Sequence, residues 1–123
     1  MNLVDSSGWL AFFADSKNAE KFSIPILDVE RLVVPTIVIY EVSKVLLRER
    51  GEEAAIVGQA HLEQGTVVDL SAKLAISAAV VSHDHRIPMA DSIILATAKA
   101  FNATIWTQDD HFKSQSNVKF FPA

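Results

Sequence analysis

The sequence contains no cysteine, so neither a disulfide framework nor a thiolate metal site can form. This absence fits a reducing compartment. The first residues lack the basic region and long apolar core of a signal peptide. The longest uncharged apolar run, residues 32–40, is too short for a transmembrane helix, which needs about 20 residues. We therefore expect a soluble, cytoplasmic protein with no membrane contact.

The sequence also lacks internal repeats, low-complexity segments and linkers rich in Pro, Gly or Ser. Its 123 residues, 50% of them hydrophobic, suffice for one core, and we expect residues 1–123 to form a single domain. The patterns GxSxG, GxxxxGK[ST] and GxGxxG are all missing. The chain therefore gives no sign of a serine hydrolase, a P-loop nucleotide site or a dinucleotide site.

Short apolar segments alternate with helical patterns along the chain. The expected strands are residues 2–4, 32–34, 66–68, 104–107 and 118–121. The expected helices begin at Ser6 or Ser7, near 19–22, at Ser23 or Pro25, and then cover 36–50, 52–64, 71–81 and 89–101, with residues 83–88 as a connection. This alternation predicts an α/β fold with a parallel sheet and helices on both faces. Such sheets bind ligands beyond the carboxyl ends of their strands.

Four acidic residues lie where these elements begin or end: Asp5, Glu41, Asp91 and Asp109. Asp5 and Asp109 follow the first and fourth strands. Glu41 and Asp91 lie near the starts of helices, which in right-handed βαβ units begin at the same edge of the sheet. Carboxylates are seldom buried unless they are paired or bind a metal. We therefore predict that the four converge and hold divalent cations.

The helical register strengthens this prediction for two of the acids. Glu41 shares its face with Val38, Val42 and Val45, and Asp91 is followed by apolar residues three, four and seven positions later. A carboxylate within an apolar stripe is unusual on an amphipathic helix. The alternative is an ordinary first-turn acid, favoured by the helix dipole. Finding the pattern twice favours a site.

Other interpretations apply to the remaining polar residues. Asp5 could cap the following helix, although the serines after it could do so equally well. Asp109 and Asp110 could be ordinary loop acids. Asp69, after the third strand, is interpreted as part of a helix cap with Ser71 rather than as a ligand.

The histidines give a weaker signal than the acids. His83 and His85 form an HxH pattern, which is weak evidence for a metal site in a connection that looks polar and exposed. His111 lies two residues after Asp109 and is a candidate for substrate contact.

The formal net charge of −4 argues weakly against a polyanionic partner. Fifteen acids minus the four candidates leaves eleven, which equals the eleven Lys and Arg residues. The remaining surface is then about neutral, and the cations show no basic stripe. Oxygen ligands alone suit Mg²⁺ or Mn²⁺. Cations would also relieve the repulsion among clustered carboxylates.

Four segments match a known family in order and spacing: VDSSGWLAFF, VPTIVIYEVSKVLL, IPMADSIILATA and ATIWTQDDHF. With these segments the chain resembles the PIN-domain ribonucleases, and among them the VapC-type toxins of prokaryotic toxin–antitoxin pairs. The resemblance implies a three-layer α/β/α sandwich with a parallel sheet of about five strands. Asp5, Glu41 and Asp91 match the three near-invariant acids of the family, and Asp109 matches a more variable fourth one.

The resemblance also implies an activity and partners. Its members cleave RNA with Mg²⁺ or Mn²⁺, leaving a 3′-hydroxyl and a 5′-phosphate, so all four acids are assigned as catalytic and metal-binding residues. Ser6 and Thr107 match small hydroxyl residues that order the site in relatives, and we assign them to the substrate-binding region. A cognate antitoxin and a homodimer are expected, with Trp9, Phe12 and Phe13 as possible interface residues.

Three other functions would each fit part of this sequence pattern. A catalytically silent PIN-like module that binds RNA or protein would keep the fold without the chemistry. A phosphoacceptor receiver domain would need an acidic pair after the first strand, where only Asp5 followed by two serines is present, and a Lys directly after the fourth strand, where the sequence has Gln108 and two acids. A phosphatase with a DxD nucleophile loop is excluded because Ser7 stands where the second Asp is required.

Overall fold

The computed structural model describes residues 1–123, and five strands form one parallel sheet. The strand order is β3-β2-β1-β4-β5. Hydrogen bonding pairs Leu3 of the central strand with Val33 on one side and Ile105 on the other. The strands are β1 (Asn2–Val4), β2 (Leu32–Pro35), β3 (Thr66–Val68), β4 (Thr104–Thr107) and β5 (Val118–Phe120).

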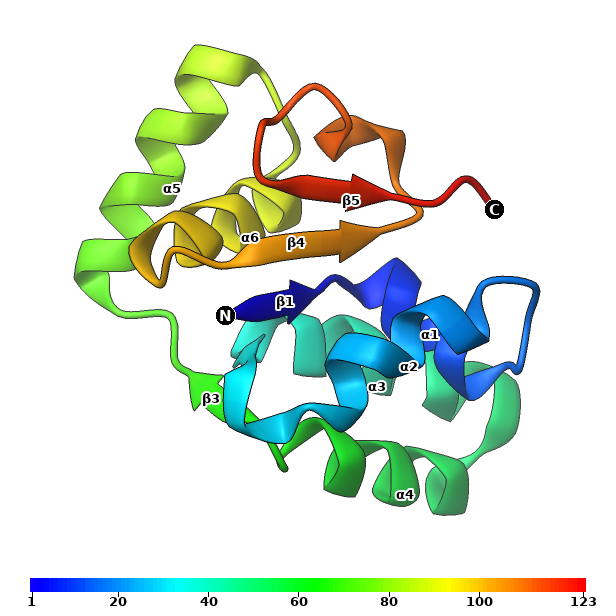
Figure 1. Cartoon of the computed structure of the whole chain (residues 1–123). Helices are drawn as coiled ribbons and strands as arrows, with labels where there is room; N and C mark the ends of the chain where they lie inside the picture. Colours follow the sequence, from blue (N-terminus) through cyan, green and yellow to red (C-terminus); the bar gives the residue numbers. More distant parts are fainter.

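Six α-helices and two 3₁₀ turns connect the strands: α1 (Ser6–Phe13), α2 (Ala19–Leu27), α3 (Thr36–Arg50), α4 (Glu52–Leu62), α5 (Ala72–His85), α6 (Met89–Ala100), η1 (Val29–Arg31) and η2 (Asp110–Phe112). Figure 1 shows α2 in front of the sheet and α3 and α6 behind it. Helix α5 packs on α6, and α4 packs on α3. The predicted three-layer α/β/α sandwich with a parallel five-stranded sheet is confirmed.

The side of the sheet on which successive strands are added changes at β1. Strands β2 and β3 are added on one side of β1, whereas β4 and β5 are added on the other side. All strands are parallel, so β1 and β4 end at the same edge, as their arrows show in Figure 1. Loops leaving neighbouring strands toward opposite layers create a crevice at this point. Asp5 follows β1 and Gln108 follows β4 at this crevice.

The core lies on both sides of the short central strands. Leu3, Val33 and Ile105 are fully buried, as their continuous apolar segments predict for a parallel sheet. Trp9 of α1 is also fully buried and stacks on Phe13 with ring centroids 5.8 Å apart. Trp9 is therefore a core residue and is not among the exposed residues that could contribute to a dimer interface. Phe12 is only partly buried.

Two elements differ from the expected ones. Residues 19–27 form one helix that contains Pro25 in its last turns, instead of a second helix starting at Ser23 or Pro25. Proline removes one backbone hydrogen bond, and the packing of buried Pro25 and Ile26 offsets that loss.

Helix α5 also extends beyond the expected end at residue 81. It ends where Arg86 adopts a left-handed conformation with φ of 55°, so His83 and His85 are helical. Other boundaries differ from the expected ones by at most two residues. None of the helices is both long and apolar enough to cross a bilayer.

Candidate active site

Asp5 is a buried carboxylate held by three donors at the end of β1. Its Oδ1 accepts hydrogen bonds from Ser7 Oγ at 2.7 Å and from the Gly8 backbone N–H at 3.0 Å. Its Oδ2 accepts one from Thr107 Oγ1 at 2.6 Å. Only 3% of Asp5 is exposed. The bond to Gly8 makes Asp5 the N-cap of α1, so the expectation that a serine would serve there is wrong. The cap uses Oδ1 alone, so Oδ2, which accepts from Thr107, takes no part in it.

Thr107 and Ser7 link this carboxylate to the loop after β4. Thr107 Oγ1 accepts a hydrogen bond from the backbone N–H of Asp109 at 2.8 Å. Ser7 Oγ accepts one from the backbone N–H of Gln108 at 3.0 Å. The two hydroxyls therefore fix the loop that carries Asp109 relative to Asp5. Thr107 and Ser7 thus order this loop, and Ser7 is not among the candidate residues predicted from the sequence. The assignment of Ser6 and Thr107 to the substrate-binding region stays a prediction.

Asp91 and Asp109 face one imidazole. Nδ1 of His111 lies 2.8 Å from Asp91 Oδ2 and 3.2 Å from Asp109 Oδ1. The Asp109 carboxylate also accepts the backbone N–H of His111 at 2.9 Å and so caps η2. One ligand atom from each of Asp91, Asp109 and His111 lies within 4.8 Å of the others. Asp110, the alternative to Asp109, is exposed and is not part of this group.

Glu41 and Asp5 lie outside this group of three. Glu41 extends from the apolar side of α3, and its Oε1 accepts a hydrogen bond from Ser6 Oγ at 2.6 Å. Ser6 directly follows Asp5, so this contact places Glu41 beside the start of α1. Thr107 connects Asp5 with Asp109. The four acids and His111 come from four separate segments of the chain, namely the end of β1, helix α3, helix α6 and the segment after β4.

Burial and mutual repulsion disfavour ionised carboxylates here. Burial raises the pKa of the Asp5 carboxyl to about 6, despite its three hydrogen bonds, and the charge of Asp109 adds to this. Burial also raises the pKa of Asp91, again with a contribution from Asp109. The hydrogen bond to Asp91, together with the charge of Asp109, raises the pKa of His111 above its usual 6.5. The site thus concentrates negative charge that a cation can neutralise.

The donor set fits a divalent cation. Carboxylate oxygens suit Mg²⁺ and Mn²⁺, and an imidazole nitrogen suits Mn²⁺ and later transition metals. The three ligand atoms are already close together without large movement of the chain. Burial is the main cause of the raised pKa values of Asp5 and Asp91, and the charge of Asp109, which a cation would offset, adds to both.

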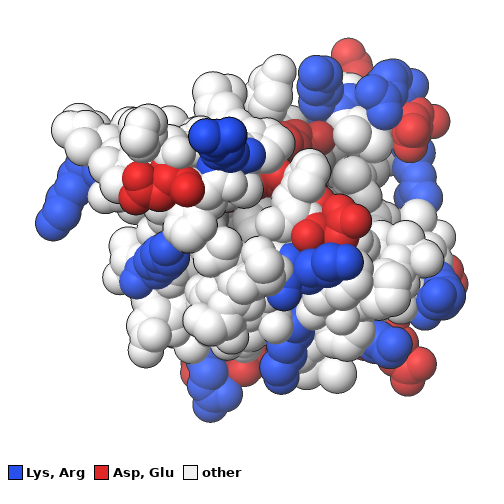
Figure 2. Space-filling view, turned by 90° about the horizontal axis from the view of Figure 1, so that it is seen from above, with Lys and Arg blue, Asp and Glu red and all other residues white.

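The four candidate acids do not line an enclosed cavity, although Asp5 is itself buried. The largest hollow, about 540 Å³, is lined by side chains of α3 from Tyr40 to Arg48, and none of the hollows is lined by a candidate acid. Figure 2 shows Lys and Arg scattered over one face, most of them beside acids, without a continuous basic stripe. An open acidic site can accept a polymer, whereas a small substrate is normally enclosed.

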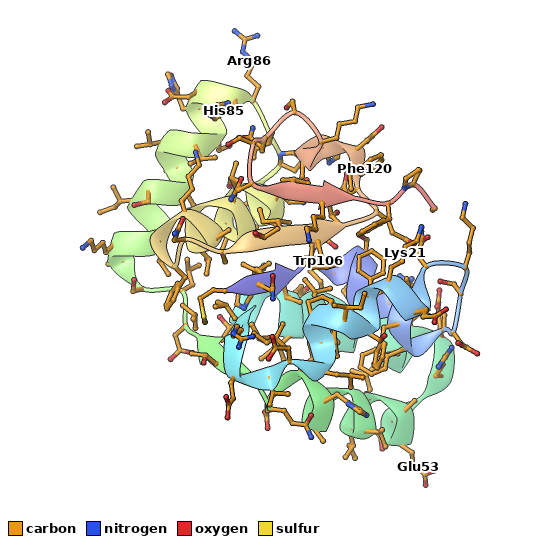
Figure 3. All side chains as sticks on the ribbon, viewed as in Figure 1. Lys21, Glu53, His85, Arg86, Trp106 and Phe120 are labelled. Atoms are coloured by element: carbon orange, nitrogen blue, oxygen red, sulfur yellow. The ribbon has the colours of Figure 1, made fainter.

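The remaining histidines do not join the site. His83 and His85 are exposed, and two helical residues at this spacing point in different directions, so the HxH interpretation is wrong. Figure 3 shows His85 and Arg86 at the end of α5, with Arg86 extending away from the sheet. His61 packs against Phe12 and Phe13 instead. Ser71 caps α5 by accepting from the Leu74 N–H, while Asp69 is exposed and has no capping bond.

Comparison with known proteins identifies related folds. The chain is similar to a chain of a toxin–antitoxin complex from Klebsiella pneumoniae, with 16% identity over 100% of both chains and a TM-score of 0.81. It is similar to VapC20 of Mycobacterium tuberculosis, a toxin that cleaves the sarcin–ricin loop, with 22% identity over 99% of this chain and 100% of that one and a TM-score of 0.80.

A third similar structure is VapBC2 of Rickettsia felis bound to a promoter DNA fragment. It shares 17% identity over 98% of this chain and 97% of that one, with a TM-score of 0.75. No curated protein sequence matches. The family model of the PIN domain matches residues 3–117, a range that includes strands β2 to β4, most of β1 and all four acids. The chain belongs to the PIN domain family.

Proposed function

We propose that this chain is an Mg²⁺- or Mn²⁺-dependent endoribonuclease and the toxin of a toxin–antitoxin pair. The observation that carries the proposal is the convergence of Asp91, Asp109 and His111 beside buried Asp5 at the carboxyl ends of β1 and β4. The family and the open site support a polymeric substrate. No other cluster of the chain brings three acid or histidine ligand atoms together.

Asp5, Asp91 and Asp109 are the residues that would hold the cation. Asp5 contributes mainly through its charge, because hydrogen bonds already occupy both of its oxygens. When bound, a divalent cation lowers the pKa of a water molecule and neutralises charge that develops on the phosphate oxygens. Thr107 and Ser7 hold the segment after β1 and the loop after β4 in fixed positions relative to each other while charge changes at the site.

Glu41 is the proton acceptor in this proposal. The Ser6 hydroxyl occupies Oε1, which leaves Oε2 free to take a proton from the attacking water. The water oxygen forms a bond to phosphorus, the bond from phosphorus to O3′ breaks, and the leaving O3′ takes a proton from solvent. The products are a 5′-phosphate and a 3′-hydroxyl. General-base catalysis of this kind contributes about 10²–10⁴-fold.

Cleavage of RNA by the purified chain tests the proposal. We expect cleavage with Mg²⁺ or Mn²⁺, no cleavage with EDTA, and a loss of about 10²-fold or more for Asp5→Asn and Glu41→Gln. Asp69→Asn is the matched control, since Asp69 is an exposed acid outside the site. Cleavage that persists in EDTA and in Asp5→Asn would contradict the mechanism. Absence of both cleavage and Mn²⁺ binding would favour a silent PIN-like module.

The toxin role rests on the similar structures, two of which are described as toxin–antitoxin or VapBC complexes and one as an RNA-cleaving toxin. We therefore propose a cognate antitoxin, a homodimer and action on cytoplasmic RNA. A small neighbouring reading frame that encodes a DNA-binding protein should yield a product that co-purifies with the chain and inhibits cleavage. Light scattering tests the dimer. An isolated gene without such a neighbour would leave only the nuclease function.

A further inference from the structure

We propose that His111 is a nitrogen ligand of the divalent cation through Nδ1, and that it makes the site prefer Mn²⁺ and later transition metals over Mg²⁺. This inference rests on the proposed metal-dependent function. It concerns a residue that the match of the four acids does not include. It also changes the expected metal, because a site made only of oxygen ligands suits Mg²⁺ as well as Mn²⁺.

The imidazole is directed at the two carboxylates that face it. Nδ1 lies 2.8 Å from Asp91 Oδ2 and 3.2 Å from Asp109 Oδ1. Neighbouring ligands of an octahedral ion with bonds of about 2.1 Å are about 3.0 Å apart. Both distances from Nδ1 are therefore close to the separation of neighbouring ligands on a shared ion. One ligand atom from each of the three residues lies within 4.8 Å of the others.

The backbone holds His111 in this position independently of the imidazole. Its N–H donates to Asp109 Oδ1 at 2.9 Å, and the next residue, Phe112, is fully buried and anchors η2 in the core. The His111 side chain itself is 53% exposed, and its Nδ1 faces both acids. A partly exposed imidazole that faces two candidate metal-binding acids is suited to binding the same ion.

Mg²⁺ and transition metals differ in how well they bind a nitrogen ligand. Mg²⁺ strongly prefers oxygen ligands and keeps much of its water, whereas imidazole is a good ligand for transition metals. Replacing an imidazole by an amide should therefore weaken Mn²⁺ binding far more than Mg²⁺ binding. A purely structural ion pair between His111 and Asp91 would predict that His111→Gln binds neither ion more weakly, because losing the competing imidazole would leave the acids free for either ion.

Pulsed electron paramagnetic resonance of bound Mn²⁺ tests the proposal, because a directly bound imidazole produces a ¹⁴N modulation. The protein should carry no histidine tag. We expect this modulation in the wild type, its loss in His111→Gln, and its retention in His85→Gln, an exposed control on α5. Calorimetry should show that His111→Gln weakens Mn²⁺ binding by about 10-fold or more, a scale typical of a perturbed metal ligand shell. Mg²⁺ binding should change much less.

The outcomes separate this inference from the proposed function. Mn²⁺ binding and RNA cleavage without ¹⁴N modulation would overturn the inference and leave the nuclease intact. Modulation that persists in His111→Gln would overturn it as well, because another nitrogen would be the ligand. A wild type that binds no Mn²⁺ at all would overturn the proposed function and the inference together. The wild-type spectrum shows whether any nitrogen binds the ion even if a variant fails to fold, and its absence there would overturn the inference.

Discussion

Thr107 donates its hydroxyl proton to Oδ2 of Asp5 at 2.6 Å, across the junction between two adjacent parallel strands. The same hydroxyl accepts the backbone N–H of Asp109 at 2.8 Å. Thr107 is fully buried, so neither bond is weakened by competing water. One small side chain thus sets the positions of two candidate metal-binding acids.

Replacing Thr107 with valine should damage both stability and activity. Thr107→Val keeps the volume but leaves Asp5 without one donor and the Asp109 N–H without its acceptor. We expect the free energy of unfolding to fall by about 1–3 kcal/mol and RNA cleavage to fall more than 10-fold. Thr107→Ser, which keeps the hydroxyl, should stay close to wild type in urea unfolding and cleavage assays. Equal loss in both variants would contradict the role of the hydroxyl.

The stability of the metal-free protein should fall as pH rises. The pKa of Asp5 is about 6 in the folded chain and about 3.8 ordinarily, so the folded state binds more protons between these values. Stability is then greatest below pH 4 with respect to this group, and is lost as pH rises through 6. The difference corresponds to about 3 kcal/mol. The raised pKa values of Asp91 and His111 act in the same direction, the latter above pH 6.5.

Urea unfolding in EDTA at several pH values measures this dependence. Asp5→Asn removes the titrating group but keeps an oxygen for the Gly8 N–H, so its stability should vary less between pH 4 and pH 6. Mn²⁺ should stabilise the wild type most at neutral pH, because ligand binding to the folded state adds to its stability. A wild type whose stability rises between pH 4 and pH 6 would show that burial of Asp5 does not control this range.

Removing the Ser6 hydroxyl should affect catalysis without affecting the fold. Ser6 Oγ donates to Glu41 Oε1 at 2.6 Å, and both residues are only partly buried. Ser6→Ala should lower cleavage about 10-fold because Glu41 loses its fixed orientation, while unfolding changes by less than about 1 kcal/mol. Ser23→Ala is a control, since Ser23 bonds only a carbonyl within α2. Normal cleavage by Ser6→Ala would exclude a positioning role.

Gly8 should be intolerant of a side chain. A Cβ there would lie 2.6 Å from Val4 Cγ1 and 2.8 Å from Phe22 Cδ1, at the junction of β1, α1 and α2. Gly8→Ala should lower the free energy of unfolding by about 1–3 kcal/mol through overpacking. Gly58→Ala is the matched control: its contact is the end of the Leu46 side chain, which can move, and the helix gains from alanine. Thermal unfolding distinguishes the two.

Much of the fold could be predicted because its signals are local. The strands around Leu3, Val33 and Ile105 are short apolar runs, and the helix from Thr36 ends at Gly51, as its sequence predicts. Pro25 was misjudged because packing of α2 tolerates a proline that local propensity treats as a helix start. The expected end of α5 at residue 81 is wrong because the helix continues to His85. It ends at Arg86, whose left-handed conformation cannot be predicted from an arginine in the sequence.

The candidate site also has some parts that local sequence patterns predict and others that they do not. The four acids stood out because each lies at the end of an apolar element. The parts that no local pattern reveals are the contacts across segments: Ser7 with Gln108, and His111 with Asp91, which are separated by 101 and 20 positions. The only sequence signal for His111 was its place two residues after Asp109. Whether a polar residue orders a site depends on the strand order, which brings β1 beside β4.

Parallel measurement of Mn²⁺ binding and RNA cleavage tests most directly whether the acids form a catalytic metal site. Both are measured on the same preparations of the wild type and Asp91→Asn, with calorimetry for binding. We expect cleavage to reach half its maximum at the Mn²⁺ concentration that half-saturates the protein, and Asp91→Asn to weaken binding and cleavage together. Cleavage in EDTA, or full cleavage by an Asp91→Asn protein that has lost Mn²⁺ binding, would contradict a metal-dependent nuclease.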